Sequence, residues 1–350
     1  MDGLVNRVSP AVQRAGKGRL KAAWTLVLLA PLCAEAAFTG ISLPAIWLAF
    51  PLLIPLYGGG VLLARELVCR AGSGWLGVLV IGFAYELAED GLGLQALTSP
   101  HLYGAAHWGR IFGINVTYWE SQIGYHLVFS LLIPIALTGI IFNQHAGRPY
   151  LGRFGLIGTA VAFVIGIGLT RLAIASTQDP GYHESLAVMV TVVLGMIVLG
   201  VIALVVLPRL GKVRPRPFAR LPRPAVLGIV GGIAPIVFLG LIFPLNLNGA
   251  SGPAVGHGAW VAIPMLVSLA VAIVVGWLVA RWSATEGFTG LYLIWLIGGA
   301  LVGHSLAALA SGIAGGHAGR SLLIGAVVIA VTVLALIALA RRRGSQSGPV

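Results

Sequence analysis

The chain has 350 residues, of which 9% are charged and 58% hydrophobic, and its mean hydropathy is +0.97. A soluble domain normally carries about a quarter of its residues as charged side chains, so a soluble globular fold is excluded. Disordered, collagen-like and disulfide-scaffold proteins are excluded too, because the chain is apolar, its 49 glycines follow no triplet period and it has two cysteines. The composition therefore predicts an all-α, polytopic integral membrane protein.

Ten apolar windows are long enough to cross the bilayer as helices, since about 20 residues span about 30 Å of hydrocarbon. The first window is too long for a cleaved signal peptide and no small-residue cleavage site ends it cleanly, so we expect it to be retained as a helix. The windows lie at 22–42, 45–68, 74–98, 119–142, 154–175, 185–207, 224–246, 259–280, 287–310 and 320–340.

The basic residues favour an orientation with both termini in the cytoplasm. With ten helices, 19 of the 22 Lys and Arg residues fall on the cytoplasmic side, and only Arg110, Arg171 and Arg320 fall outside. This segregation follows the positive-inside rule. It divides the chain into a basic cytoplasmic tail (1–21), helices 1–6 (22–207), a basic Arg/Pro-rich cytoplasmic loop (208–223), helices 7–10 (224–340) and a second basic cytoplasmic tail (341–350).

The loop at 208–223 alternates Arg with Pro, a pattern that favours extended backbone and a linker between the two sets of helices. Its basic side chains could also contact anionic lipid. Nucleic acid is not an expected partner, because no soluble fold accompanies the basic residues. The scarcity of lysine and the excess of Ala, Gly and Val indicate a bacterial source, and with it a plasma-membrane location.

Six of the ten acidic residues lie at the ends of predicted spans or in loops, and four lie well inside spans: Glu35 in the first, and Glu86, Glu89 and Asp90 in the third. An ionised side chain near the bilayer centre costs roughly 2.5–3.5 kcal/mol on insertion scales. Helical spacing puts the three acids of the third span on one patch. They must therefore face protein or water, find partners, or carry protons.

Other polar residues are expected at the same depth, in the outer half of the bilayer, when the helical rise of about 1.5 Å per residue is applied. Gln122, His126 and Ser130 form a stripe on the fourth helix, and Arg171 and His304 lie near the outer ends of the fifth and ninth. An aromatic-rich segment at 99–119 is expected on the outer side, either as an interfacial belt or as a cap over the acids. The predicted binding residues are Glu35, Glu86, Glu89, Asp90, Gln122, His126 and Arg171.

Glu89-Asp90, followed by His126 and His304 on later helices, resembles the CPBP family of intramembrane metalloproteases, the CAAX-processing and bacteriocin-immunity group. That family carries EExxxR, FxxxH and HxxxN motifs. Here Leu94 stands at the Arg position, Gln122 precedes His126, and Ala308 follows His304. The resemblance implies a hydrolase in which Glu89, Asp90, His126 and His304 are catalytic and a divalent metal such as zinc activates water.

Three functions remain open at this stage. The leading hypothesis is a transporter or permease for a small solute or ion that uses the intramembrane carboxylates. The alternatives are the CPBP-like hydrolase and a structural or partner subunit of a larger complex, whose other subunits the sequence does not identify. No GxxxxGK[ST] phosphate-binding loop is present, so ATP-derived energy would have to come from another chain. A divalent metal such as zinc is implied only under the hydrolase hypothesis, and the sequence does not otherwise identify a cofactor.

Overall fold

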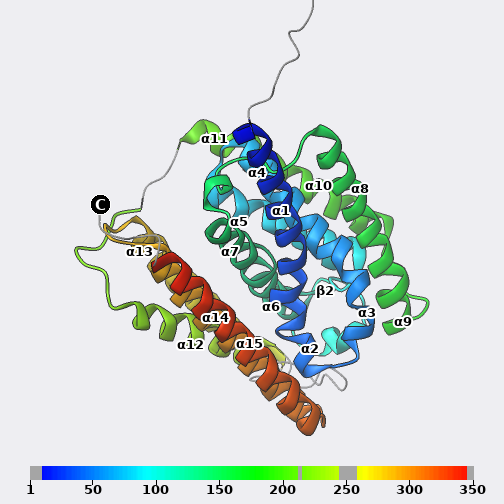
Figure 1. Ribbon diagram of the computed structural model, residues 1–350. Coiled ribbons are helices and arrows are strands. Elements are labelled where there is room, and N and C mark those ends of the chain that lie inside the picture. Colours follow the sequence, from blue (N-terminus) through cyan, green and yellow to red (C-terminus); the bar gives the residue numbers. More distant parts are fainter. Residues whose placement is uncertain (1–9, 212–214, 244–257, 345–350) are drawn as a thin grey trace, which may run out of the picture.

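The computed structural model describes residues 10–211, 215–243 and 258–344, and most of them lie in helices (Figure 1). Several long helices contain short π-helical turns, which are labelled η, as are the short 3-10 helices η4, η6 and η10. The N-terminal helices are α1 (Pro10–Pro31), η1 (Leu32–Ala36), α2 (Thr39–Ser42), α3 (Ile46–Leu53), η2 (Ile54–Gly59), α4 (Gly60–Ala71), α5 (Gly74–Glu86) and η3 (Leu87–Gly93).

The middle of the chain begins with a short outer segment that includes an antiparallel hairpin. Its elements are η4 (Leu102–His107), β1 (Arg110–Ile111), β2 (Ile114–Asn115), α6 (Val116–Tyr125), η5 (His126–Leu132), α7 (Ile133–Ile141), η6 (Asn143–His145), α8 (Arg153–Thr170), η7 (Arg171–Ala175) and α9 (Ser176–Gln178). The remaining elements are α10 (Leu186–Val201), η8 (Ile202–Val206), α11 (Leu207–Leu210), α12 (Pro224–Ile242), η10 (Gly258–Val261), α13 (Ala262–Ala284), α14 (Gly290–Ala314) and α15 (Ala318–Gly344).

Eight continuous helical runs among the described residues are long and apolar enough to cross a membrane. They coincide with eight of the ten predicted spans. The runs at Arg153–Gln178 and Ala318–Arg342 bury only 11% and 6% of their most apolar windows inside the protein, so their exposed faces suit contact with lipid. The prediction of an all-α membrane bundle is confirmed.

The other two predicted spans are also helical, but they carry charged residues. Within the window 74–98, the helix runs from Gly74 to Gly93 and contains Glu86, Glu89 and Asp90. The helix that covers most of the window 22–42 begins at Pro10 and ends at Ala36. The short helix α2 follows after Phe38, whose backbone is not helical (φ −127°, ψ −75°). The ten-helix count remains a prediction.

Parts of the predicted segments lie outside the described residues, namely 1–9 of the first tail, 212–214 of the loop, 244–246 of the seventh window and 345–350 of the last tail. The helices α12–α15 form a group beside the larger group α1–α11 (Figure 1). Within the smaller group α14 packs along both α12 and α15, and α14 and α15 also reach α2 of the larger group.

Two basic residues of one predicted cytoplasmic turn hold the next predicted cytoplasmic loop at one end of the larger group. The guanidinium of Arg65 donates to the carbonyls of His145, Ala146 and Arg148 at 3.2, 2.9 and 2.9 Å. Arg70 donates to the carbonyl of Leu151 at 2.6 Å. Between them, Glu66 is fully buried and accepts hydrogen bonds from Arg65 and from the amides of residues 150 and 151. This buried ion pair joins the two predicted cytoplasmic turns.

The Arg/Pro-rich loop is non-helical at residues 215–223, where it packs against the end of α13, whereas residues 208–210 of the predicted loop belong to α11. Arg281 donates to the carbonyl of Arg216 at 2.9 Å, and its guanidinium lies 4.1 Å from the centre of the Phe218 ring. The backbone amide of Phe218 donates to Thr285 Oγ1 at 2.9 Å. The loop is therefore held to the C-terminal group of helices by specific contacts.

Candidate functional site

The four acidic side chains of the predicted spans are all buried. Glu86 and Asp90 are 0% exposed, Glu89 is 2% exposed and Glu35 is 8% exposed. They come from three helical segments, the end of α5, η3 and η1. Together with His126 at the start of η5, these residues are called the acid cluster below.

Two tyrosines connect the acids of different helices. Tyr57 Oη, on η2, lies 2.8 Å from Glu35 Oε1 and 2.7 Å from Glu89 Oε1. Tyr125 Oη lies 2.8 Å from the carbonyl of Ala34 and 3.3 Å from Glu35 Oε1. A tyrosine hydroxyl has one proton to donate, so the second contact of Tyr57 is satisfied only if Glu35 or Glu89 carries a proton.

His126 faces the acids from a fourth segment. Its Nδ1 lies 3.6 Å from Glu89 Oε2 and 2.9 Å from Ser130 Oγ, one turn along η5. Glu86, Glu89 and His126 each offer one potential ligand atom, and these atoms all lie within 4.8 Å of one another. Residues of the third and fourth predicted helices that were expected at one depth therefore also lie close together in the structure.

Among the described residues, His126 is the only basic side chain that pairs with the acids of the acid cluster. No arginine or lysine in residues 10–211, 215–243 and 258–344 forms an ion pair with Glu35, Glu86, Glu89 or Asp90. Both carboxyl oxygens of Glu86, Oε2 of Glu89 and Oδ2 of Asp90 are buried and accept no close hydrogen bond from a donor group in those ranges. The carboxyl groups of Glu86 and Asp90 instead face each other, an arrangement that requires a shared proton. Buried, unpaired carboxylates are very unfavourable, so the cluster must hold protons or bind a cation.

The helices that carry the acid cluster and Tyr57 each contain a π turn at that point: η1, η2, η3 and η5. Proline accounts for part of this. Pro31 has no N–H to bond the carbonyl of Val27, and that carbonyl lies where a Cβ on Gly58 would be only 2.5 Å away. The close approach of α1 and η2 brings Tyr57 beside Glu35. π turns inside α-helices are frequent at functional sites.

The predicted outer segment covers the acids on one side. Trp108 and Tyr118 are 3% exposed and pack with Leu94, Leu102 and neighbouring alanines in a small apolar cluster. Tyr118 Oη lies 3.5 Å from Asp90 Oδ1. Of the two structures expected for residues 99–119, this arrangement matches a cap.

Comparison with protein families gives one result. A family model described as an uncharacterized membrane protein family matches residues 25–342. The chain belongs to this family. The match extends over every residue of the acid cluster and over both groups of helices. Neither the curated proteins nor the solved structures gave a significant match to the chain.

Two of the binding residues predicted from the sequence donate their side-chain hydrogen bonds outside the acid cluster. Arg171 donates to the carbonyl of Leu92 at 2.8 Å and to Gln95 Oε1 at 2.9 Å, rather than to a carboxylate. The amide of Gln122 donates to Ser121 Oγ at 3.3 Å. Equal depth in the bilayer does not fix the lateral direction of a side chain, which explains both differences.

His304 also lies apart from the potential metal ligands. Its Nε2 lies 3.3 Å from the carbonyl of Ala34, and its ring stacks on Phe129 with 3.6 Å between ring centres. It approaches the acid cluster through Tyr125, whose ring centre is 4.9 Å away. His304 is fully buried and its Nδ1 has no partner in the described part of the chain.

Sequence reasoning missed Tyr57, Tyr118 and Tyr125. In a membrane protein a tyrosine is usually read as an interfacial or packing residue, so nothing distinguished these three from the others. One signal was available for Tyr57, which follows Pro51 and Pro55 and precedes three glycines. A helix with that composition is prone to distortion.

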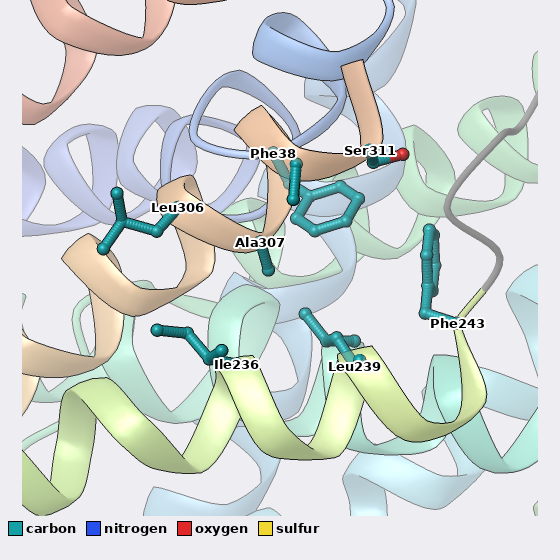
Figure 2. A pocket seen from close by; sticks show the side chains of 9 residues that line it. Phe38, Ile236, Leu239, Phe243, Leu306, Ala307 and Ser311 are labelled. Carbon is teal, nitrogen blue, oxygen red and sulfur yellow. The ribbon is translucent and has the colours of Figure 1, made fainter. Parts of the chain in front are cut away.

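A small pocket of about 120 Å³ lies between α12 and α14 (Figure 2). Its lining is almost wholly apolar and includes Phe38, Leu239, Phe243 and Leu306. The ring of Phe38 separates it from His304, at 4.8 Å between ring centres. Such a lining suits a hydrocarbon group rather than a cation, which leaves the acid cluster as the candidate functional site.

Proposed function

We propose that this membrane protein is a transporter of a small cation and that the acid cluster is its cation-binding site. The observation that carries the proposal is the set of buried oxygens on Glu86, Glu89 and Asp90, which no arginine or lysine of the described ranges neutralises. Carboxylates with no basic partner attract cations, and intramembrane acids commonly mark ion or proton pathways. A purely structural cluster would be expected to pair these oxygens.

A large cavity at the opposite end of the helices supports a transport pathway. It has a volume of about 920 Å³ and lies between the turn that joins α4 to α5, the end of α7 and the start of α14. Val78 lines it on α5, eight residues before Glu86. At about 1.5 Å per residue, the cavity reaches to about 12 Å from Glu86 along that helix. A cation released from the cluster would have a short path to it.

The hydroxyl group of Tyr57, which lies between two carboxyl groups, supports coupling of cation transport to protons. Glu35, Tyr57 and Glu89 form a continuous hydrogen-bonded chain in which one carboxyl must be protonated when both contacts are made. A proton can move along such a chain without a change in the positions of the heavy atoms. Binding of a cation to Glu89 would then release a proton toward Glu35.

Transport is favoured over the CPBP-like hydrolase by the position of His304. The family resemblance assigns a catalytic role to Glu89, Asp90, His126 and His304 together. His304 instead contacts Ala34 and Phe129, outside the group formed by Glu86, Glu89 and His126.

The flux of cations through reconstituted protein tests this proposal. Proteoliposomes would be loaded with a pH-sensitive dye or a metal-sensitive dye, or assayed for radioactive sodium uptake. We expect wild-type protein to give a pH-dependent flux of one of these cations, and we expect Glu89→Gln to reduce it at least tenfold, because the amide removes a charged ligand. Absence of flux above empty liposomes for protons, sodium and divalent metals alike would refute the proposal.

We further propose that the chain lies in a bacterial plasma membrane with both termini in the cytoplasm. The gathering of Arg65 and Arg70 with the loop at 145–151 supports this orientation, because basic residues collect on the cytoplasmic side. In that orientation the 920 Å³ cavity lies at the cytoplasmic end of the helices. The basic loop at 208–223 would then lie against anionic lipid headgroups.

A further inference from the structure

We propose that Glu86, Glu89 and His126 form a binding site for a divalent transition-metal ion of the zinc class. This inference deepens the proposed function and rests on it in one respect, because it names the cation that the acid cluster carries. Binding of the metal itself can be tested without transport.

The three side chains have the positions and the burial that a metal site needs. Their potential ligand atoms lie within 4.8 Å of one another. Ligands around a four-coordinate zinc ion lie about 3.3 Å apart, as follows from bond lengths of about 2.0–2.2 Å. Small side-chain rotations would close the set around an ion. All three residues are at most 2% exposed, so water would not compete strongly for the ligand positions.

The oxygens that would bind the ion are not held by a basic side chain. Both oxygens of Glu86 and Oε2 of Glu89 are buried and accept no close hydrogen bond from a donor group in the described ranges. Glu86 faces the carboxyl group of Asp90, and Glu89 faces Tyr85, so a bound ion would take the place of a proton shared between Glu86 and Asp90. The other oxygen of Glu89 is already held by Tyr57 at 2.7 Å. An outer hydrogen bond of this kind fixes the orientation of a carboxylate ligand and leaves its second oxygen for the metal.

The Nδ1 atom of His126 lies 3.6 Å from Glu89 Oε2 and 2.9 Å from Ser130 Oγ. An ion bound at Nδ1 would therefore replace the contact with Ser130. A neutral imidazole with two carboxylates favours zinc and its neighbours over magnesium and calcium, which prefer oxygen ligands alone. The charge also balances, since one divalent ion neutralises two carboxylates. Three protein ligands leave a coordination position for water, which allows the ion to enter and leave.

The decisive experiment measures metal binding by the full chain, purified without a polyhistidine tag and reconstituted in nanodiscs. Equilibrium dialysis against Zn²⁺, with metal determined by mass spectrometry, gives the stoichiometry and affinity. Co²⁺ then reports the ligand set through its visible absorption. We expect one Zn²⁺ per chain, and at least a tenfold loss of affinity in Glu86→Gln and in His126→Gln.

Two variants serve as matched controls. Glu120→Gln alters a half-buried glutamate on α6 whose carboxylate accepts a hydrogen bond from Ser268 at 2.6 Å, away from the cluster. His183→Ala removes an exposed histidine. Both should bind Zn²⁺ like wild type, and size-exclusion chromatography should show that every variant is folded.

The outcomes separate this inference from the transport proposal. Undetectable Zn²⁺ binding by wild type, or unchanged binding in both Glu86→Gln and His126→Gln, would overturn the metal site even if protons or sodium are transported. Specific Zn²⁺ binding without any cation flux would support the metal site and contradict the transporter.

Discussion

At the residue scale, Tyr57 carries one hydroxyl proton but lies within hydrogen-bond distance of both Glu35 and Glu89. Its ring is 3% exposed, so water does not replace either contact readily. Loss of the hydroxyl leaves buried carboxyl oxygens without a donor, and an unsatisfied buried polar group costs about 1–3 kcal/mol. The loss of stability on removal of this hydroxyl therefore measures how strongly Glu35 and Glu89 depend on Tyr57.

We therefore expect Tyr57→Phe to lower the free energy of unfolding by about 1–3 kcal/mol, measured by thermal unfolding in detergent. The control is Tyr182→Phe, which removes a hydroxyl bonded to the neutral Thr98 at 3.0 Å. That change should cost less than about 1 kcal/mol, because a neutral hydrogen bond contributes less than one to a charged group. An equal or greater loss in Tyr182→Phe would show that the contacts of Tyr57 are not special.

A second residue-scale prediction concerns Asp179, on the loop between α9 and α10. Burial acts to raise the pKa of Asp179, but hydrogen bonds from Ser99 and His101 outweigh it and hold the pKa below its usual value. The folded state thus favours the charged form. Its stabilising effect is fully present above the unfolded-state pKa of about 3.9 and is lost as the pH falls through the lower folded-state pKa.

Asp179→Asn should consequently lower the melting temperature at pH 7, because the amide offers one accepting oxygen where the carboxylate offers two. The difference from wild type should shrink as the pH falls below about 4, where Asp179 becomes protonated in the unfolded state, and should vanish below the lower folded-state pKa. Melting curves of both proteins between pH 3 and pH 7 provide the measurement. A difference that does not change with pH would indicate a steric effect.

At the element scale, the acid cluster depends on interruptions of regular helix, and these were harder to predict than the acids themselves. The insertion cost of charge singled out Glu35, Glu86, Glu89 and Asp90 from the sequence alone. The π turns were not predicted, because they arise where two helices pack closely, as Val27 and Gly58 do. Such pairs are set by tertiary contacts that one sequence does not reveal.

Glycines also set the packing of α12 on α14. A Cβ on Gly299 would overlap the carbonyl of Gly228, and one on Gly303 would overlap that of Gly232. Small residues allow helices in membranes to approach closely. We expect Gly299→Ala to destabilise the protein by about 1–3 kcal/mol, because the two backbones must separate.

The matched variant is Gly276→Ala on α13, where an added Cβ has no neighbour within 4 Å. It should leave stability unchanged or raise it by up to about 1 kcal/mol, because alanine is the better helix former. Thermal unfolding of the two variants side by side gives the comparison. Equal losses in both would argue against close packing of α12 and α14.

At the scale of the whole molecule, the sequence predicted the helical membrane class and eight spans well, because hydrophobicity and length decide them. It also predicted that the acids and His126 share one depth. It did not predict which helices are neighbours, so it grouped Arg171 with the acids although that side chain bonds Gln95. Nor did it indicate that α12–α15 form a group beside the other helices (Figure 1).

The most direct test of cation transport by the acid cluster measures charge movement across reconstituted membranes. The membranes are adsorbed on an electrode, and cation-free buffer is rapidly replaced by buffer with Zn²⁺ or by acid. If the acid cluster carries cations, wild type gives a transient current, and Glu86→Gln reduces it at least tenfold. The control variant Glu120→Gln keeps the current. Currents of equal size in wild type and Glu86→Gln would contradict the role of the cluster, as would currents absent from all three proteins.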